Sequence, residues 1–168
     1  DAGVSSSTVA AYKQLLEAGP LPIRVNVMLA ATDQFYTERL AEGHFRDADD
    51  TLTINSVKIA ADGALGSRGA AMIDDYSDMA GHRGLILHSE ERIHYFMRAA
   101  MNAGFQVNTH AIGDAAIGCI GSNAVTADCS FAIAIRCITA TSSSLSISAA
   151  SPLHHHHRYL LHHRYRYF

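Results

Sequence analysis

The alternation of strand-like and helical segments is the feature that most restricts how this chain folds. Three segments have the alternating or β-rich composition of strands, and a helical pattern precedes each of them. The strands are expected at residues 23–30, 52–61 and 105–110, and the helices at residues 5–19, 32–43 and 89–104. Parallel strands need crossover connections of this kind, whereas antiparallel strands can be joined by tight turns. The order therefore predicts an α/β fold built on parallel strand pairs.

The segment from Ser89 to Gly104 carries the clearest helical signals. Ser89 is a good N-cap, acidic residues follow it at the positive end of the helix dipole, and Gly104 ends the helical pattern. Apolar residues recur at helical spacing and predict the buried stripe: Ile93, Phe96, Met97 and Ala100.

Residues 119–168 differ in composition from residues 1–118. The first part contains nine Lys and Arg against fifteen Asp and Glu, whereas the second contains four Arg and a single acidic residue. The second part also holds all three cysteines and six of the eleven histidines, and it shows no helical or strand period bounded by capping residues. We expect one domain over residues 1–118, followed by a compositionally biased, poorly structured tail over residues 119–168.

Charge and hydropathy argue against several classes of partner. A formal net charge of −3 gives no reason to expect nucleic acid or a membrane surface. No apolar run approaches the ~20 residues of a membrane helix and no signal peptide is visible, so a cytoplasmic location is favoured. The three cysteines lack the paired spacing of a disulfide framework or a zinc site. The first residue is Asp rather than Met, so we expect the chain to start inside a longer protein. No feature predicts an oligomeric state.

His110 is the first candidate functional residue. It ends the strand 105–110, on which Gln106 and Asn108 share its face, and a Gly-Asp pair follows at once. Ligands bind at the carboxyl ends of the strands in parallel α/β folds. Two interpretations remain open, a metal ligand or a histidine that forms a hydrogen bond in a loop.

Lys58 is the second candidate, because it lies in an otherwise apolar strand. Strict alternation groups it with Ile54 and Ala60, opposite Val57 and Ile59. Buried lysines are rare unless paired. A Schiff-base amine, a lysine carboxylated by carbon dioxide to become a metal ligand, and a side chain that snorkels from an edge position are all compatible with the pattern. Asp62, just past the strand, is either a turn residue or an acid at the mouth of a pocket, and hence a possible catalytic group.

A glycine-rich loop follows the second strand. Its segment "GALGSRGA" matches neither the phosphate-binding Walker pattern nor the dinucleotide fingerprint. Ser67 and Arg68 are candidate substrate-binding residues on a mobile loop, with Arg68 placed over an anionic or carbonyl group; a plain flexible loop is the alternative. The tail histidines, His154 to His157 with His162 and His163, lack the helical spacing of a zinc protease and fit a biased tail.

Several motifs together resemble the amidohydrolase family 3 group of the metal-dependent amidohydrolase superfamily, the relatives of N-substituted formamide deformylase. The similarity covers about residues 1–118. The segments that carry it are "DAGV", "VKIAADGALGSRGAA", "YSD", "HRGLILHSEE" and "NAGFQVNTHAIGDAAI".

The resemblance implies a (β/α)8 barrel with a divalent metal at the carboxyl ends of its strands, zinc being favoured, as one or two ions in the intact enzyme. It implies that His110 and Lys58, the latter carboxylated, are metal ligands. The implied reaction is hydrolysis of a non-peptide C–N bond in a small amide, formamide or cyclic amide by metal-activated water.

The sequence also departs from this family. The resemblance implies a His-x-His pair before Asp1, a histidine on the sixth barrel strand and an aspartate on the eighth, and the chain has no counterpart of these residues. We therefore expect a partial barrel of about three strands that is inactive alone, with a tail that arises from a frameshift, a mis-predicted exon or a retained intron. Two other functions remain open: a Schiff-base lyase or other α/β enzyme that uses Lys58, and a non-catalytic module whose His-rich tail binds metal.

Overall fold

The computed structural model describes residues 1–121, and the order of helices and strands follows the expected alternation. The strands are β1 (Ala2–Val4), β2 (Val25–Ala30), β3 (Phe45–Arg46), β4 (Leu52–Ala60) and β5 (Gln106–His110). The helices are α1 (Ser6–Leu16), α2 (Tyr36–Glu42), α3 (Glu90–Asn102) and α4 (Asp114–Gly121). The predicted biased tail, residues 119–168, lies almost wholly outside the described residues.

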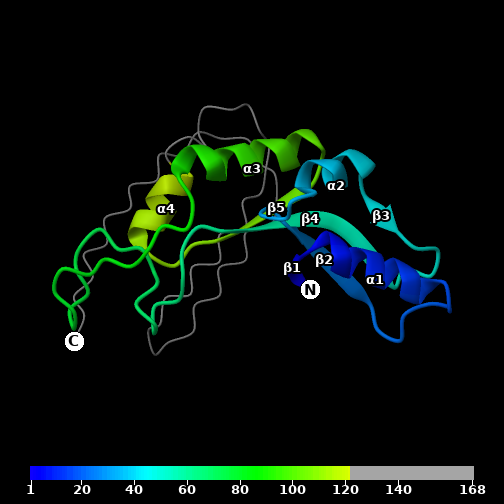
Figure 1. Cartoon of the computed structure of the whole chain (residues 1–168), viewed down its shortest axis with the longest axis horizontal. Coiled ribbons are helices and arrows are strands. Elements are labelled where there is room, and N and C mark those ends of the chain that lie inside the picture. Colours follow the sequence, from blue (N-terminus) through cyan, green and yellow to red (C-terminus); the bar gives the residue numbers. More distant parts are fainter. Residues whose placement is uncertain (122–168) are drawn as a thin grey trace, which may run out of the picture.

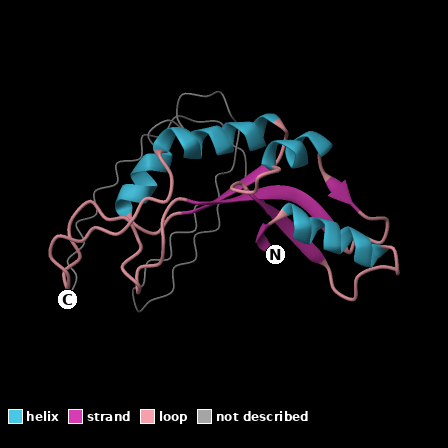
Figure 2. Ribbon diagram, in the orientation of Figure 1, coloured by secondary structure: helices cyan, strands magenta, loops and turns pink. Residues whose placement is uncertain are grey.

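The strands form one sheet in which β1, β2, β4 and β5 are parallel neighbours in chain order (Figure 1). The short β3 pairs antiparallel with the start of β4, and β5 pairs with its later half, so β3 and β5 share the edge of β4 that β2 does not occupy. Right-handed crossovers between strands in sequential order place the helices on one face. Figure 2 shows α2 and α3 along one side of the strands. The α/β prediction is confirmed.

The face that packs against the helices forms the hydrophobic core. One row of paired residues, Val4, Leu29, Val57 and Val107, crosses all four parallel strands and is buried throughout. The helix α3 covers this face with the stripe that its sequence predicts, and Ser89 caps it by accepting a hydrogen bond from the backbone N–H of Arg92 at 3.3 Å. His94 is also buried there, and its Nε2 lies 3.1 Å from the Cys119 carbonyl.

The strand β4 does not keep strict alternation along its length. Val27 of β2 pairs with Ile54, but the next residue, Met28, pairs with Ser56, so Asn55 is an extra residue in β4. Such a bulge reverses the alternation of the residues beyond it. Ile54 is therefore buried in the same core as Val57, and the prediction that grouped it with Lys58 is wrong.

Three further differences concern additional elements and one helix boundary. The residues "AGV", for which the sequence pattern predicts no strand, form β1, because pairing with β2 supplies partners that a local pattern does not reveal. The helix expected from Thr32 begins at Tyr36 and has no side-chain cap. A further helix, α4, follows the Gly-Asp pair after β5. No helix of residues 1–121 is both long and apolar enough to cross a membrane.

Candidate functional site

Lys58 and His110 lie on the same face of the sheet, at the carboxyl ends of neighbouring parallel strands. Lys58 pairs with Asn108 and Ala60 pairs with His110, so the two candidate residues are one diagonal step apart. The strand spacing and rise separate their Cα atoms by roughly 8 Å. Both are partly exposed on the face opposite the buried row of valines and leucine. The structure thus brings together the two residues that stood out separately in the sequence.

Lys58 has no ion-pair or hydrogen-bond partner for its amine within residues 1–121. Its neighbour on β2 in the register is Ala30, and its stem lies beside β1, where a Cβ at Gly3 would be 4.0 Å from Lys58 Cγ. Small residues on both strands to one side of Lys58 leave room around its side chain. Among the described residues, no acidic side chain therefore holds this amine.

Asp62 is the most deeply buried polar residue near His110. Its carboxylate accepts hydrogen bonds from the backbone N–H groups of Ala71 at 3.0 Å, Ile112 at 3.0 Å and Gly113 at 2.7 Å. His110 Nε2 lies 3.8 Å from Asp62 Oδ1, and the side-chain exposures are 34% for His110 and 0% for Asp62. Asp62 therefore joins the strand end of β4 to two separate segments, the glycine-rich loop and the turn between β5 and α4.

The glycine-rich loop after β4 is tightly organised rather than plainly flexible. Gly63 and Gly69 pair through a backbone hydrogen bond of 3.0 Å, and Leu85 and Leu87 donate to the carbonyls of Gly69 and Ala61. In Figure 1 this loop leaves the sheet on the side of α4. Gly113 contacts it so closely that a Cβ there would lie 1.8 Å from the Ala71 carbonyl oxygen.

Ser67 and Arg68 lie on the outer part of this loop. The Ser67 hydroxyl donates to the Ala64 carbonyl at 3.2 Å. The Arg68 guanidinium forms a bidentate ion pair with Asp78, with contacts of 2.8 and 3.2 Å. Hydrogen bonds from Arg68 hold the pKa of the Asp78 carboxyl below its usual value. The described contacts of both residues are thus within the loop, and their role in substrate binding stays a prediction.

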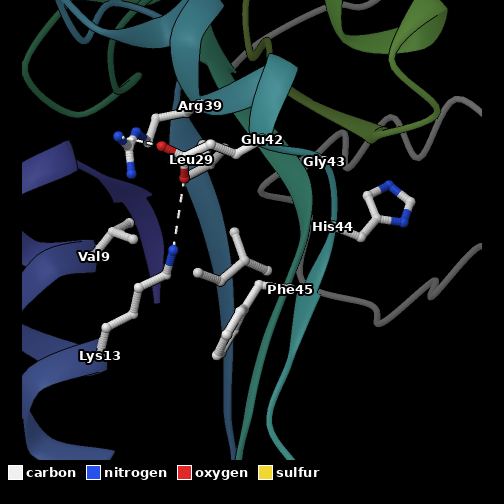
Figure 3. Close-up of a pocket in the computed structure, with 9 residues that line it drawn as sticks. Val9, Lys13, Leu29, Arg39, Glu42, Gly43, His44 and Phe45 are labelled. Atoms are coloured by element: carbon white, nitrogen blue, oxygen red, sulfur yellow. Dashed lines mark ion pairs between the residues drawn. The ribbon is translucent and has the colours of Figure 1, made fainter.

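A small cavity of about 60 Å³ lies on the opposite side of the sheet, between α1, α2 and β3. Figure 3 shows Lys13 and Arg39 reaching Glu42 from two sides, with a Lys13 Nζ to Glu42 Oε2 distance of 3.6 Å. Leu29 and Ile54 line it, and both belong to the helix-facing side of their strands. Because Lys58 and His110 project from the other face, this cavity is separate from the candidate site. Its volume is far below the ~300 Å³ of a typical ligand pocket.

The sequence pattern did not reveal the part that Asp62 plays. Its backbone partners are 9, 50 and 51 residues away, so no local motif marks them. The one available signal was that a dipeptide of Asp and Gly follows each of two neighbouring strands, Asp62-Gly63 after β4 and Gly113-Asp114 after β5. No group of three or more His, Cys, Asp or Glu in the described part of the chain is arranged to hold a metal ion.

The fold and site define an α/β protein with polar groups at the carboxyl ends of sequential parallel strands, where such folds bind ligands. Residues 2–129 match the model of the Amidohydrolase family, and the chain belongs to this family. The match extends beyond residue 118, the expected limit of the similarity.

Two curated proteins are similar to parts of the chain. One is the putative amidohydrolase YtcJ of Bacillus subtilis (strain 168), 30% identical over 116 residues that make up 68% of this chain and 21% of that protein. The other is the protein LONG AFTER FAR-RED 3 of Arabidopsis thaliana, 40% identical over 65 residues, or 39% of this chain and 11% of that protein.

Two solved structures share the fold. Both are described as uncharacterized metal-dependent hydrolases, one from Pyrococcus furiosus and one from Pyrococcus horikoshii OT3, and each has a TM-score of 0.63. The identities are 28% and 29%, over 71% of this chain in both cases. The chain spans 25% and 24% of those structures and about a fifth of YtcJ.

Proposed function

We propose that this chain supplies part of the metal site of a hydrolase that cleaves a non-peptide C–N bond in a small amide, formamide or cyclic amide. Membership of the amidohydrolase family and likeness to two metal-dependent hydrolases support the reaction class. The observation that carries the proposal is the diagonal placement of Lys58 and His110 on one face at the strand ends. The four sequential parallel strands would then belong to a (β/α)8 barrel.

The donor set of these two residues fits a divalent metal, for which zinc is the first choice. An imidazole nitrogen is a common zinc ligand. The Lys58 amine would serve as a ligand once carbon dioxide converts it to a carbamate, and the absence of an acidic partner within residues 1–121 leaves it open to that reaction. A bound metal ion of this kind lowers the pKa of its water ligand and polarises a carbonyl oxygen.

The residues of this chain have separate parts in the proposed site. His110 on β5 and Lys58 on β4 would hold the metal ion. Lys58 and His110 are partly exposed on their face of the sheet, whereas the helix-facing side is filled by the core. A hydrolytic site normally needs three protein ligands, and residues 1–121 offer two at this position, so we propose that the isolated chain has little or no turnover.

Metal binding by variants of the whole 168-residue chain tests the proposal. The tail histidines could bind zinc themselves, so all six are first replaced by alanine: His154→Ala to His157→Ala, His162→Ala and His163→Ala. In this background we expect zinc binding that His110→Ala and Lys58→Ala each weaken and that His44→Ala leaves unchanged. His44 is a matched control because it packs against Phe105 with ring centroids 4.6 Å apart, on the helix-facing side.

A second experiment tests the proposed carbamate. With ¹³C-labelled bicarbonate we expect an NMR signal of a carbamate on Lys58, and Lys58→Ala should remove this signal. Each alternative function predicts a different result. Zinc binding lost with the tail histidines and retained in His110→Ala would instead indicate a metal-binding module. Borohydride trapping of a carbonyl compound on Lys58, without bound metal, would indicate a Schiff-base enzyme.

A further inference from the structure

The Asp62 carboxylate has almost exhausted its capacity for hydrogen bonds. An ionised carboxylate offers about four acceptor sites. Three are taken by backbone N–H groups: Oδ2 accepts from Ala71 and Gly113, and Oδ1 accepts from Ile112. The remaining capacity is on Oδ1. Within residues 1–121, the one basic side-chain nitrogen within ion-pair distance of this carboxylate is Nε2 of His110, at 3.8 Å from Oδ1.

The contact between His110 and Asp62 is close to a hydrogen bond. Shortening 3.8 Å to an N–H···O distance of about 2.9 Å needs a ring movement of roughly 1 Å. The His110 side chain is about one third exposed and has room for this movement, whereas the Asp62 carboxylate is fixed by its three backbone donors. The fixed carboxylate therefore determines the position of the His110 imidazole ring when the two form a hydrogen bond.

We propose that Asp62 is a positioning residue for His110: its Oδ1 accepts a hydrogen bond from the Nε2–H group, so that Nδ1, which carries no proton in this tautomer, faces the open side of the sheet. The proposal rests on the proposed function insofar as Nδ1 is the atom that binds the metal. Partners of this kind fix the tautomer and the orientation of a ligating imidazole.

The same carboxylate links this ring to the glycine-rich loop. Its bond to Ala71 anchors the loop, and its bonds to Ile112 and Gly113 anchor the turn that follows His110. Asp114 is a useful comparison because it also connects these two segments. Its carboxylate accepts hydrogen bonds from the backbone N–H groups of Ile73 at 2.8 Å and Ala115 at 2.9 Å, and it has no described contact with His110. A purely structural role for Asp62 would make the two acids equivalent.

The tautomer of His110 tests the inference directly. The full chain is labelled with ¹⁵N-histidine, kept free of metal and studied by long-range ¹H–¹⁵N NMR above the ordinary imidazole pKa of about 6.5. The spectrum of His110→Ala identifies the His110 signals. We expect the proton on Nε2 in the unmodified chain and in Asp114→Asn, and a shift of both ring-nitrogen signals toward a tautomer mixture in Asp62→Asn.

Two results would overturn the inference: a proton on Nδ1 in the unmodified chain, or unchanged ring signals in a folded Asp62→Asn. If Asp62→Asn does not fold, the tautomer of the unmodified chain decides by itself. Zinc affinity, measured in the background without tail histidines, should fall about 10–100-fold in Asp62→Asn and remain unchanged in Asp114→Asn. Absence of zinc binding in that background would refute the proposed function while leaving the tautomer result to decide the role of Asp62.

Discussion

Replacing Gly113 by alanine should disrupt the junction between the glycine-rich loop and the turn after β5. The added Cβ would lie 1.8 Å from the Ala71 carbonyl oxygen and 2.3 Å from its carbon. Because these are backbone atoms of a buried residue, no side chain can rotate to relieve the overlap. The two segments must therefore move apart by about 1.5 Å to restore an ordinary contact distance.

The cost of this movement can be estimated from the contacts at the junction. Overpacking in a dense region costs about 1–3 kcal/mol. The separation also stretches two hydrogen bonds. One runs from the Gly113 N–H to the Asp62 carboxylate at 2.7 Å, and the other from the Ala115 N–H to the Ala71 carbonyl at 3.1 Å. A hydrogen bond to a charged group contributes about 1.5–3 kcal/mol. The expected loss of unfolding free energy is about 3–5 kcal/mol, a large part of the ~5–15 kcal/mol typical of a domain.

Urea unfolding of matched variants provides the assay. Gly66→Ala is the control within the same loop, because a Cβ at Gly66 meets nothing within 4 Å and its backbone φ is an ordinary one. Gly118→Ala is the control within α4, where an added methyl also meets nothing and favours the helix by up to about 1 kcal/mol. The reasoning is refuted if the urea midpoint of Gly113→Ala, at an unchanged slope, falls no further than that of Gly66→Ala.

Three other predictions concern individual contacts. Tyr36→Phe removes the buried hydrogen bond from the Tyr36 hydroxyl to the Phe96 carbonyl, 2.8 Å in length, and should lower the unfolding free energy measured in urea by about 1–3 kcal/mol. Tyr12→Phe removes an exposed hydrogen bond to Asp1 and should have little effect. Equal losses of unfolding free energy in the two variants would contradict the argument. Ser89→Ala removes the N-cap of α3 and should cost about 1 kcal/mol by the same measurement, whereas a loss as large in Ser67→Ala would show that capping is not responsible. A hydrogen bond from the Arg83 side chain, and next one from the Gly81 N–H, lower the pKa of the Asp75 carboxyl from its ordinary value of 3.8. These hydrogen bonds therefore contribute fully to the stability of the fold above pH 3.8, and their contribution is lost as the pH falls through the lower pKa of the folded state. The Gly81 amide NMR signal should therefore shift in acid below pH 3.8, and the same titration in Asp75→Asn should abolish this shift.

The elements of this fold that sequence reasoning found are those whose signals are local. The helix α3 has its cap, its acidic first turn and its apolar stripe within sixteen consecutive residues, Ser89 to Gly104, and each signal acts within the helix itself. The face shared by Gln106, Asn108 and His110 follows in the same way from alternation along a regular strand. The elements that were missed depend on partners that are distant in sequence: β1 exists because β2 lies beside it, and Asp62 gains its role from backbone groups up to 51 residues away.

The candidate site follows the same division. The residue types at Lys58 and His110 pointed to chemistry, and their proximity required only that the two strands be adjacent and parallel. The environment of the imidazole could not be predicted, because it depends on how the loop after β4 folds back. That path is determined by close backbone contacts at Gly84 and Gly113, where a Cβ would lie 1.9 Å from the Ala70 oxygen and 1.8 Å from the Ala71 oxygen, respectively. No amphipathic pattern encodes such contacts.

The extra residue in β4 has a consequence for how this strand tolerates change. Asn55 is the residue at which β4 departs from one-to-one pairing with β2, and its side-chain oxygen is buried without a hydrogen-bond partner among residues 1–121. Deleting Asn55 would relieve that unsatisfied group and join Ile54 to Ser56, so that β4 would pair with β2 without interruption. Strict alternation would then keep Leu52, Ile54 and Val57 in the core and Lys58 on the opposite face. Flattening the bulge with Asn55 still present would instead turn either Lys58 into the core or Leu52 and Ile54 out of it. The bulge thus allows a strand with one extra residue to keep its core contacts and still present the Lys58 amine near its end.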